Sequence, residues 1–376
     1  MKNEYDITVI GAGLSSLMFL SKTLKSKPNL SILVLEQKKT IDHTQSFCVW
    51  EGPGLIDIEK EYKLKSKHSW DKIFINDNVE KIKKNISPYR YVYHDGFETF
   101  KSLKKQIKSK VKILYDTKVK KVDEQGTNVK VTSSKGTFIS NYLVDSRPKV
   151  SKDEIKSEYV HQAFLGTEIE LASNNFDNSS ATIMSFSKNK KETEFVYQLP
   201  FSKRRTLVET TLFSSNPDLK KLKSKHNKNL KKFGSYKILR SEKGFIPMAL
   251  IKAKKNKRIL RIGTGAGMVR ASSGYSMRKI ANWIKTFNGK KLGKSNLLTF
   301  EYSHNPTLDF FDKIFLRVIK NYPDKSNHLF LNLFKKSRHS SLIRFLSDKP
   351  SWLDILNIIL SMPKILMLKG LFKKDE

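Results

Sequence analysis

The first 36 residues carry a strand, a glycine turn, a helix and a second strand, in the order of a dinucleotide-binding βαβ unit. Residues 5–10 are an apolar run that predicts a short buried strand, and residues 11–13 predict a tight turn directly after it. From Leu14 onward apolar residues recur at helical spacing, and Pro28 ends that helix. Residues 31–35 predict the second strand. The opening of the chain therefore favours a parallel sheet that holds a nucleotide at one edge.

The glycine turn and the residue after the second strand indicate which nucleotide fits. Gly11 permits the turn, and Gly13 lets the backbone approach a pyrophosphate at the helix N-terminus. Ser16, at the third position of the pattern, is small enough for close helix–strand packing. Glu36 would accept hydrogen bonds from a ribose 2′-hydroxyl and repel a 2′-phosphate, which favours FAD or NAD over NADP. The alternative is a βαβ turn without a ligand. The predicted contacts are Gly11, Ala12, Gly13, Leu14 and Glu36.

A second glycine-rich stretch, residues 263–274, favours a flavin over a nicotinamide. A plain NAD-binding domain does not need another glycine-rich strand-to-helix turn about 250 residues after the first. Large two-domain flavoproteins do, because the ribityl chain and the isoalloxazine ring contact backbone on the far side. Asp145, at the end of a predicted strand, is either a further ligand contact or a structural cap of that strand. The predicted contacts in the second stretch are Gly263, Thr264, Gly265, Ala266 and Gly274.

The element types change along the chain in a way that predicts an α/β flavoprotein of two domains. Residues 1–150 read as the first part of a Rossmann-like FAD-binding domain, in which residues 37–100 are a mixed, loop-rich insertion. Successive β-rich runs in residues 151–240 predict an antiparallel sheet, which would form the substrate domain. Residues 241–290 return to the FAD-binding part, and residues 291–376 are predicted to be a helical C-terminal region.

The net charge of +36 is the most unusual number of the composition. Of the 72 basic residues only 12 are Arg, and the lysines are spread along the whole chain. Nucleic-acid sites favour Arg and carry recognisable motifs, so nucleic acid is disfavoured as a partner. A Lys-rich solvated surface explains the charge simply. An anionic membrane surface, which attracts clustered Lys, is the main alternative.

Cysteine and histidine usage narrows the compartment and excludes a metal centre. The single cysteine, Cys48, forms no internal disulfide framework, and that favours a reducing setting. The eight histidines show no metal-ligand spacing, so no metal site is predicted. No uncharged apolar run reaches the roughly 18 residues of a membrane span. We therefore expect a cytoplasmic protein that is peripherally associated with an anionic membrane surface.

Seven segments in order along the chain match the blocks of one enzyme family. Three are F-V-Y-x-L-P, L-[LV]-[IV]-E-[DE]-T and G-x-I-P-M blocks, and a fourth is the G-T-A-G-M-V-x-P-S-[ST]-G-Y signature. The seven are residues 42–47, 85–89, 195–201, 206–211, 244–248, 263–275 and 344–347. On these segments the chain resembles the bacterial lycopene cyclases, the flavoprotein type that closes the ionone rings of carotenoids. The resemblance covers nearly the full chain and is much more specific than the dinucleotide turn.

The resemblance implies an activity and its cofactors. It implies FAD in its reduced form, NAD(P)H as the reductant, and lycopene or a related linear carotene as substrate. It implies a cyclisation without net redox change, with β rings as the expected product, and a fold shared with aromatic hydroxylases and geranylgeranyl reductases. An FAD-dependent isoprenoid reductase or hydroxylase of the same fold is the alternative. A basic, non-enzymatic protein that binds membranes or nucleic acid is a third.

The chemistry of ring closure points to Glu209. An acid protonates the terminal double bond, the next double bond attacks the tertiary cation, and the new cation loses a proton. This needs an acid, a dry pocket and negative charge near the cation. Glu209 interrupts an apolar strand in which burial would raise its pKa, and alternation places Leu207, Glu209 and Thr211 on one face. The alternative for Glu209 is an outward-facing carboxylate on the sheet. A reduced flavin could supply the compensating charge or donate the proton, and the sequence leaves this choice open.

His43 and three departures from the family pattern qualify this interpretation. His43 lies in a family-like block and is either an active-site residue or a structural part of a loop. Gln45 stands where Trp is usual, and Ala271 replaces a Pro. The family usually has a second acid directly after the Glu, and here that position is Thr210. If the second acid donates the proton in relatives, this chain must use Glu209 or the flavin.

The C-terminal segment has two readings. Trp352, Ile355, Leu356 and Ile359 share one face of a predicted helix, and Pro363 ends it. The helix packs on the core, or its apolar side dips into the interface of a bilayer. In the second case the lysines at 364, 369, 373 and 374 would lie at the level of the lipid headgroups.

Overall fold

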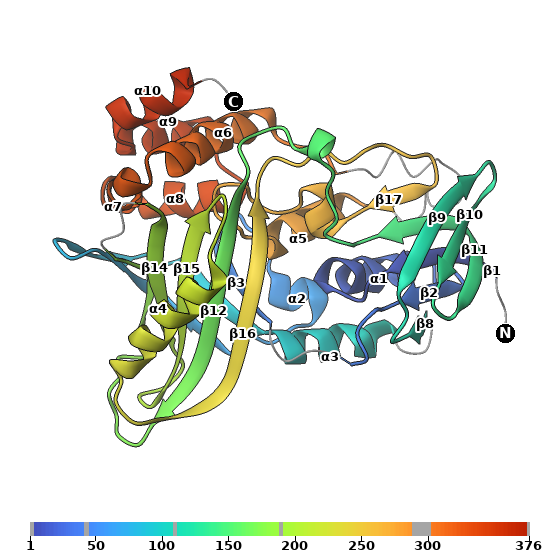
Figure 1. Ribbon diagram of the computed structural model, residues 1–376, viewed down its shortest axis with the longest axis horizontal. Helices are drawn as coiled ribbons and strands as arrows, with labels where there is room; N and C mark the ends of the chain where they lie inside the picture. Colours follow the sequence, from blue (N-terminus) through green and yellow to red (C-terminus); the bar gives the residue numbers. More distant parts are fainter. Residues whose placement is uncertain (1–3, 41–44, 108–110, 188–190, 288–301, 374–376) are drawn as a thin grey trace.

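The computed structural model describes residues 4–40, 45–107, 111–187, 191–287 and 302–373. A mostly parallel sheet forms one end of the molecule, a long antiparallel sheet stands beside it, and C-terminal helices cover one end of that second sheet (Figure 1). The element order matches the predicted division into α/β, β-rich and helical parts. The domain boundaries themselves stay a prediction, and the boundary at residue 240 falls inside a continuous strand, β16 (Tyr236–Met248).

The nucleotide sheet begins with the predicted βαβ unit. Strand β1 pairs in parallel with β2 and β11, β2 pairs with β8, and β17 pairs with β11 from a distant part of the chain. Strands β10 and β9 extend the sheet as an antiparallel hairpin. The bounds are β1 (Glu4–Ile10), α1 (Leu14–Ser26), β2 (Ile32–Leu35), β8 (Val111–Leu114), β9 (Val119–Gln125), β10 (Asn128–Ser133), β11 (Gly136–Asp145) and β17 (Ile259–Arg261).

Helix α1 packs between the sheet and two further helices, α3 (Gly96–Ile107) and α5 (Met277–Thr286). Its apolar residues are buried because strand β1 is apolar throughout its second half and offers a continuous hydrophobic surface. Phe19 of α1 stacks on Trp283 with ring centroids 6.0 Å apart and meets Phe287 edge-on. This packing joins α1 to α5 in one hydrophobic core. Because the second glycine-rich stretch precedes α5, the same packing places that stretch beside the nucleotide sheet.

The second sheet has the strand order β16-β12-β15-β14-β13-β5-β6. Its pairs are antiparallel except that of β13 with β5. The Lys-rich helix α4 (Leu219–Lys231) packs against β12 and β15. The other bounds are β12 (Val160–Leu171), β13 (Ser180–Phe186), β14 (Thr193–Pro200), β15 (Arg205–Ser214), β5 (Lys72–Asn76) and β6 (Lys81–Asn85).

The stretch predicted to be loop-rich, residues 37–100, contains five strands. Two of them, β5 and β6, complete the second sheet. The other three form a small sheet of order β3-β7-β4, made of β3 (Ser46–Glu51), β7 (Arg90–Asp95) and β4 (His68–Trp70). A short helix, α2 (Ile58–Tyr62), lies in the same stretch. The prediction missed these strands because they are short, and β6 has Ile82 as its only fully buried residue.

The C-terminal region is helical, as predicted, and is anchored to the second glycine-rich stretch. Arg270 is 1% exposed, and its guanidinium donates to Asp312 at 2.9 Å and to Asp348 at 2.8 Å. It also lies over the ring of Phe345, 4.7 Å from the centroid. The helices are α6 (Pro306–Asn321), α7 (Ser326–Lys336), α8 (His339–Leu346), α9 (Trp352–Ser361) and α10 (Lys364–Phe372).

Within the described residues, no single helix has the length and apolar composition to cross a membrane. Helices α9 and α10 meet these criteria only when taken together, and they are bent by 103° relative to each other.

Candidate active site

The first glycine turn has the geometry of a nucleotide cradle. Gly11 has a φ of +89°, and its N–H donates to the carbonyl of Leu35 at 2.8 Å. Gly13 precedes α1, and a Cβ built on it would meet nothing within 4 Å. No side chain of the described residues caps the first turn of α1. The free N–H groups at the N-terminus of this 13-residue helix therefore face open space, where they could bind an anionic group such as a pyrophosphate.

Glu36 lies at the end of β2, beside this turn. Its Oε2 accepts a hydrogen bond from the Ala12 N–H at 2.6 Å, and its Oε1 accepts one from the Lys38 N–H at 2.8 Å. These bonds fix the carboxylate, and each oxygen keeps a further lone pair for a hydroxyl donor. Leu14, the first helical residue, is buried and packs into the core of the nucleotide sheet.

The second glycine turn lies against the first. Gly263 has a φ of +69°, and a Cβ on it would meet Ser15 Oγ of α1 at 2.6 Å. Thr264 and Gly274 line a cavity that extends from here to the second sheet. The turn and the helix it faces are about 250 residues apart in sequence, as the flavoprotein prediction requires.

Three other predicted contacts have different surroundings. Asp145 is held by its neighbour Arg147, whose guanidinium donates to both carboxylate oxygens. Gly265 packs against the backbone of Arg147. Ala266 lines a separate cleft on the outer side of the turn. Asp145 therefore has the strand-end partner that the structural reading expected, and its contact with a cofactor stays a prediction.

A row of side chains crosses the second sheet beside the glycine turns. Residues in register on neighbouring antiparallel strands point to the same face. Glu209 of β15 is in register with Tyr197 of β14 and with Gly166 of β12, and Gly166 is also in register with Glu242 of β16. The order across the sheet is therefore Tyr197, Glu209, Gly166, Glu242, with one carboxyl group on each side of the glycine.

Glu209 is half-buried and lines a cavity of about 320 Å³. Burial raises the pKa of Glu209 to about 8, and the negative charge of Glu242 is the second cause. Thr211 Oγ1 donates to Glu209 Oε1 at 2.7 Å. Leu207 also lines the cavity. The predicted alternation of Leu207, Glu209 and Thr211 is thereby confirmed, and the raised pKa favours the protonated form of Glu209 at neutral pH.

Thr210, where the family usually has a second acid, points to the other face of the sheet. Its hydroxyl lies 3.1 Å from His226 Nδ1 of α4, and Asn229 donates to it. His226 in turn contacts Thr167 of β12 at 2.8 Å. This buried group joins helix to sheet, so the departure at position 210 leaves the cavity of Glu209 unchanged.

Glu242 is the acid that the sequence reasoning missed. It is 3% exposed, accepts a hydrogen bond from Ser46 Oγ at 2.9 Å and one from Arg240 Nη1 at 3.0 Å. A Cβ on Gly166 would meet its Cγ at 2.7 Å, so only a glycine leaves room for the side chain. The sequence did contain an indication of this role, because Glu242 lies two residues before the G-x-I-P-M block and therefore on the same strand face as its first residue, Gly244.

His43 lies outside the described residues, but the block that contains it continues into the site. Gln45, Ser46 and Phe47 line the cavity of Glu209. Cys48, the next residue, lines it too, and burial raises the pKa of its thiol to about 12. Among the described residues no group of three or more His, Cys, Asp or Glu side chains could hold a metal ion.

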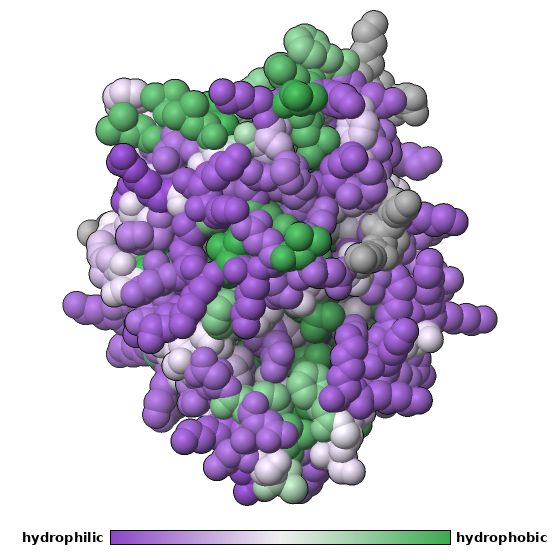
Figure 2. Space-filling view, turned by 90° about the vertical axis from the view of Figure 1, so that its left-hand side faces the viewer, coloured by the Kyte–Doolittle hydropathy of each residue, from purple (hydrophilic) through white to green (hydrophobic). Residues whose placement is uncertain are grey.

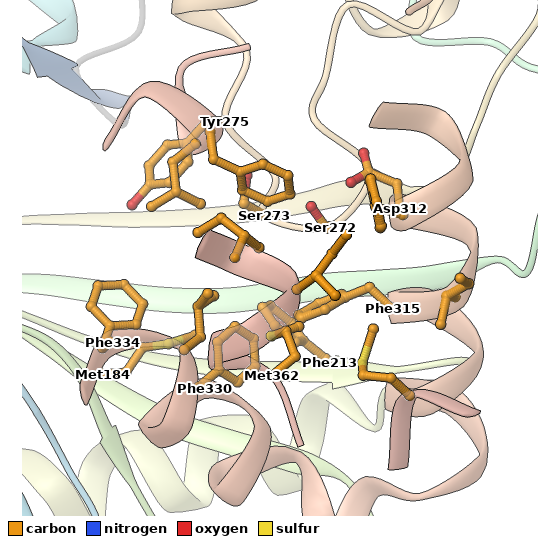
Figure 3. Close-up of a pocket in the computed structure, with 18 of the residues that line it drawn as sticks. Met184, Phe213, Ser272, Ser273, Tyr275, Asp312, Phe315, Phe330, Phe334 and Met362 are labelled. Carbon is orange, nitrogen blue, oxygen red and sulfur yellow. The ribbon is translucent and has the colours of Figure 1, made fainter. Parts of the chain in front are cut away.

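A second, strongly apolar cavity of about 380 Å³ adjoins the first. The two share Gln162, Tyr197, Ser273 and Tyr275 as wall residues. The Tyr91 and Tyr275 hydroxyls are 3.0 Å apart and lie at this junction. Figure 3 shows its aromatic lining, with Tyr275 and Asp312 on one side. Its labelled apolar side chains are Met184, Phe213, Phe315, Phe330, Phe334 and Met362.

The C-terminal helices form the outer wall of the apolar cavity. The cavity is lined by Ile359 of α9, by Met362 between the two helices, and by Met367, Leu368 and Leu371 of α10. The outer sides of the same two helices expose large apolar residues, and Figure 2 shows hydrophobic atoms gathered at the end of the molecule where these helices lie. We call this surface the apolar tip: Trp352, Leu353, Leu356, Leu360, Ile365 and Phe372, each 45–78% exposed.

Comparison with known sequences assigns these features to one family. The family model described as lycopene cyclase protein matches residues 6–371. The lycopene beta-cyclase of Pantoea ananas is 22% identical, and the match covers 99% of this chain and 98% of that protein. The neoxanthin synthase of Solanum lycopersicum is 23% identical over 73% of this chain. The match covers 58% of that synthase, so this chain spans a little over half the length of that plant relative.

Comparison with solved structures supports the fold. A flavoprotein/dehydrogenase from Cytophaga hutchinsonii superposes with a TM-score of 0.63 at 14% identity, covering 97% of this chain and 99% of that one. A geranylgeranyl bacteriochlorophyll reductase-like protein from Thermoplasma acidophilum gives 0.61 at 11% identity, covering 100% and 97%. The predicted α/β flavoprotein fold with its helical C-terminal region is confirmed.

Proposed function

The chain belongs to the lycopene cyclase family, and from this premise we propose that it closes the end ring or rings of lycopene or a related linear carotene. The observation that carries the proposal is the place of Glu209. A carboxyl group whose pKa burial raises to about 8 lines a cavity that adjoins an aromatic, apolar one and is also lined by the second glycine turn. We expect β rings as the product.

In the proposed reaction Glu209 donates its proton to the terminal double bond of the substrate. The next double bond attacks the resulting tertiary cation, and loss of a proton from the new ring gives the cyclic product. The reaction needs no net oxidant or reductant, because one proton enters and one leaves. Tyr197 and Tyr275 line the junction of the two cavities, where their aromatic rings can stabilise positive charge on the substrate.

The residues of the two glycine turns fit FAD. The N-terminus of α1 would hold the pyrophosphate, Glu36 the ribose hydroxyls, and Thr264 and Gly274 the flavin side of the cavity. Gln162 Oε1 and Ser273 Oγ are buried at the junction of the cavities and make no hydrogen bond with the described residues, which suits polar groups of a bound cofactor. When bound in its reduced form, such a cofactor would supply electron density beside the cation, and we propose NAD(P)H as its reductant.

Pigment analysis in a lycopene-accumulating host tests the activity. We expect conversion of lycopene to a product with β rings, and extraction followed by chromatography identifies it. An unchanged carotenoid profile with folded, flavin-loaded protein would refute the proposal. A reductase or hydroxylase of the same fold would instead consume one NAD(P)H for each product formed, so cofactor oxidation measured against product distinguishes the two reactions.

Replacing Gly263 by valine should remove the cofactor. The substituted residue cannot adopt a φ of +69° without strain, and its side chain would collide with Ser15 at the start of α1. We expect flavin binding to weaken about 5- to 150-fold, because one strained backbone turn costs about 1–3 kcal/mol, and flavin content after purification to fall accordingly. Gly126→Val, in an open hairpin turn of the same sheet, is the matched control because it has similar backbone strain but no neighbour within 4 Å. Equal flavin content in both variants would contradict the role of the second turn.

We also propose that the apolar tip rests on an anionic membrane at the cytoplasmic side. A hydrocarbon substrate must leave a lipid phase to reach Glu209, and the helices that expose the tip also line the apolar cavity. Lys349, Lys364 and Lys369 are exposed on the same helical region and carry the charge that anionic headgroups attract. An anionic membrane would then be the partner that the Lys-rich composition favours.

A further inference from the structure

Glu242 is too specifically held to be an incidental neighbour of Glu209. Its strand and that of Glu209 flank β12, so the two backbones are about 10 Å apart, twice the spacing of neighbouring strands. Gly166 between them has no side chain, and the Glu242 side chain lies across it. Both carboxyl groups line the same cavity. The sheet therefore places two acids over one glycine, where they interact through space.

The two acids differ in the hydrogen bonds that they receive. Glu242 accepts from a cationic guanidinium and from the Ser46 hydroxyl, and both donors favour its charged form. Within the part of the chain that the structure describes, Glu209 accepts a hydrogen bond only from the uncharged Thr211 hydroxyl. Burial raises the pKa of both carboxyl groups, but the donors at Glu242 counteract this. The hydrogen-bond donors therefore favour the proton on Glu209 and the negative charge on Glu242.

Arg240 is itself fixed by a second acid. Its Nε donates to Glu168 at 2.9 Å, and Glu168, which is 1% exposed, also pairs with Lys67 and Arg205. The guanidinium also donates to the Tyr93 hydroxyl. Arg240 is therefore held by Glu168 on one side and fixes the Glu242 carboxylate on the other.

We infer that Glu242 is a positioning residue that keeps the proton on Glu209 and so sets the pH range in which the acid works. The inference rests on the proposed function only in taking Glu209 as the acid. Ionised Glu242 disfavours a second negative charge on Glu209, so it favours reprotonation of Glu209 after each proton donation. The titratable or charged groups of the described residues around Glu209 are Glu242, Arg240, Lys243, Cys48, Tyr91, Tyr197 and Tyr275.

The test is the alkaline limb of the pH–rate profile in Glu242→Gln. In the unmodified protein the limb should lie near pH 8, where Glu209 loses its proton. Removal of the negative charge lowers the pKa of Glu209, so the limb should move by about one pH unit toward neutral. Glu242→Asp keeps the charge and should restore the limb. An unmoved limb in Glu242→Gln would overturn the inference, and so would equal loss of rate at every pH in both variants, which indicates a structural role.

Infrared titration separates this inference from the proposed activity. The band of a protonated carboxyl that is present in the unmodified protein and absent from Glu209→Gln reports the proton on Glu209 without any turnover. We expect this band to disappear near pH 8, and about one unit lower in the Glu242→Gln background. If the band shifts as expected but no ring is closed, the proposed function fails and the inference stands. If the band does not shift, the inference fails.

Discussion

Replacing Glu209 by glutamine should reduce ring closure at least about 100-fold while the protein stays folded and retains its flavin. Glutamine has nearly the same shape and can still accept the hydrogen bond from Thr211, but it has no acidic proton to donate. A positioned general acid contributes about 10²–10⁴ to a rate. The loss should appear in the rate constant of the chemical step, measured as product formed per flavin-loaded protein at saturating substrate.

Glu170→Gln is the matched control for this variant. Glu170 lies on β12 of the same sheet and is half-buried, but it does not line either cavity. It should keep the rate of the unmodified protein. Full activity of Glu209→Gln would exclude Glu209 as the acid and assign proton donation to the cofactor, an alternative that the sequence left open. A large loss in both variants would point to damage of the sheet instead.

The parts of the fold that could be predicted are those whose signal is local. The βαβ unit was predicted with its strand and helix bounds because an apolar strand, a glycine turn and an amphipathic helix follow one another within 36 residues. The face of Glu209 was predicted for the same reason, since alternation along one strand fixes which neighbours share its side.

The parts that were missed depend on pairing between distant segments. Strand β5 pairs with β6 and with β13, and β13 lies more than a hundred residues away in the sequence. The five residues of β5 are too few to predict a strand without knowledge of this distant partner. Glu242 became part of the site only through its register with Gly166, 76 residues earlier. Sequence pattern names the acid on one strand but cannot tell which residue of another strand faces it.

Replacing Leu353, Leu360 and Ile365 together by serine should lower binding to anionic vesicles about 100-fold. These side chains are 60%, 67% and 75% exposed, so their removal leaves the core intact. Full burial of one such side chain stabilises by about 1.5–3 kcal/mol, and partial insertion of three should contribute about 3 kcal/mol in all. A difference of 1.4 kcal/mol is about tenfold in affinity. Sedimentation with vesicles measures the change.

The distribution of apolar residues supplies a matched control. Val79, Leu219 and Ile238 are 91%, 53% and 56% exposed and lie outside the C-terminal helices, so their replacement by serine removes similar area elsewhere. That variant should bind vesicles like the unmodified protein. Binding should also weaken as salt rises, because exposed lysines near the tip lose their attraction to anionic lipid.

The same pair of variants tests whether the tip serves substrate entry. If lycopene passes from the bilayer between α9 and α10 into the apolar cavity, the tip variant should cyclise vesicle-embedded lycopene slowly but detergent-dispersed lycopene at the ordinary rate. This difference arises because the tip residues act on the approach to the membrane, whereas Glu209 acts on the bond that forms. Equal slowing with both forms of substrate would place the defect in the cavity, and unchanged vesicle binding would remove the tip as the contact with lipid.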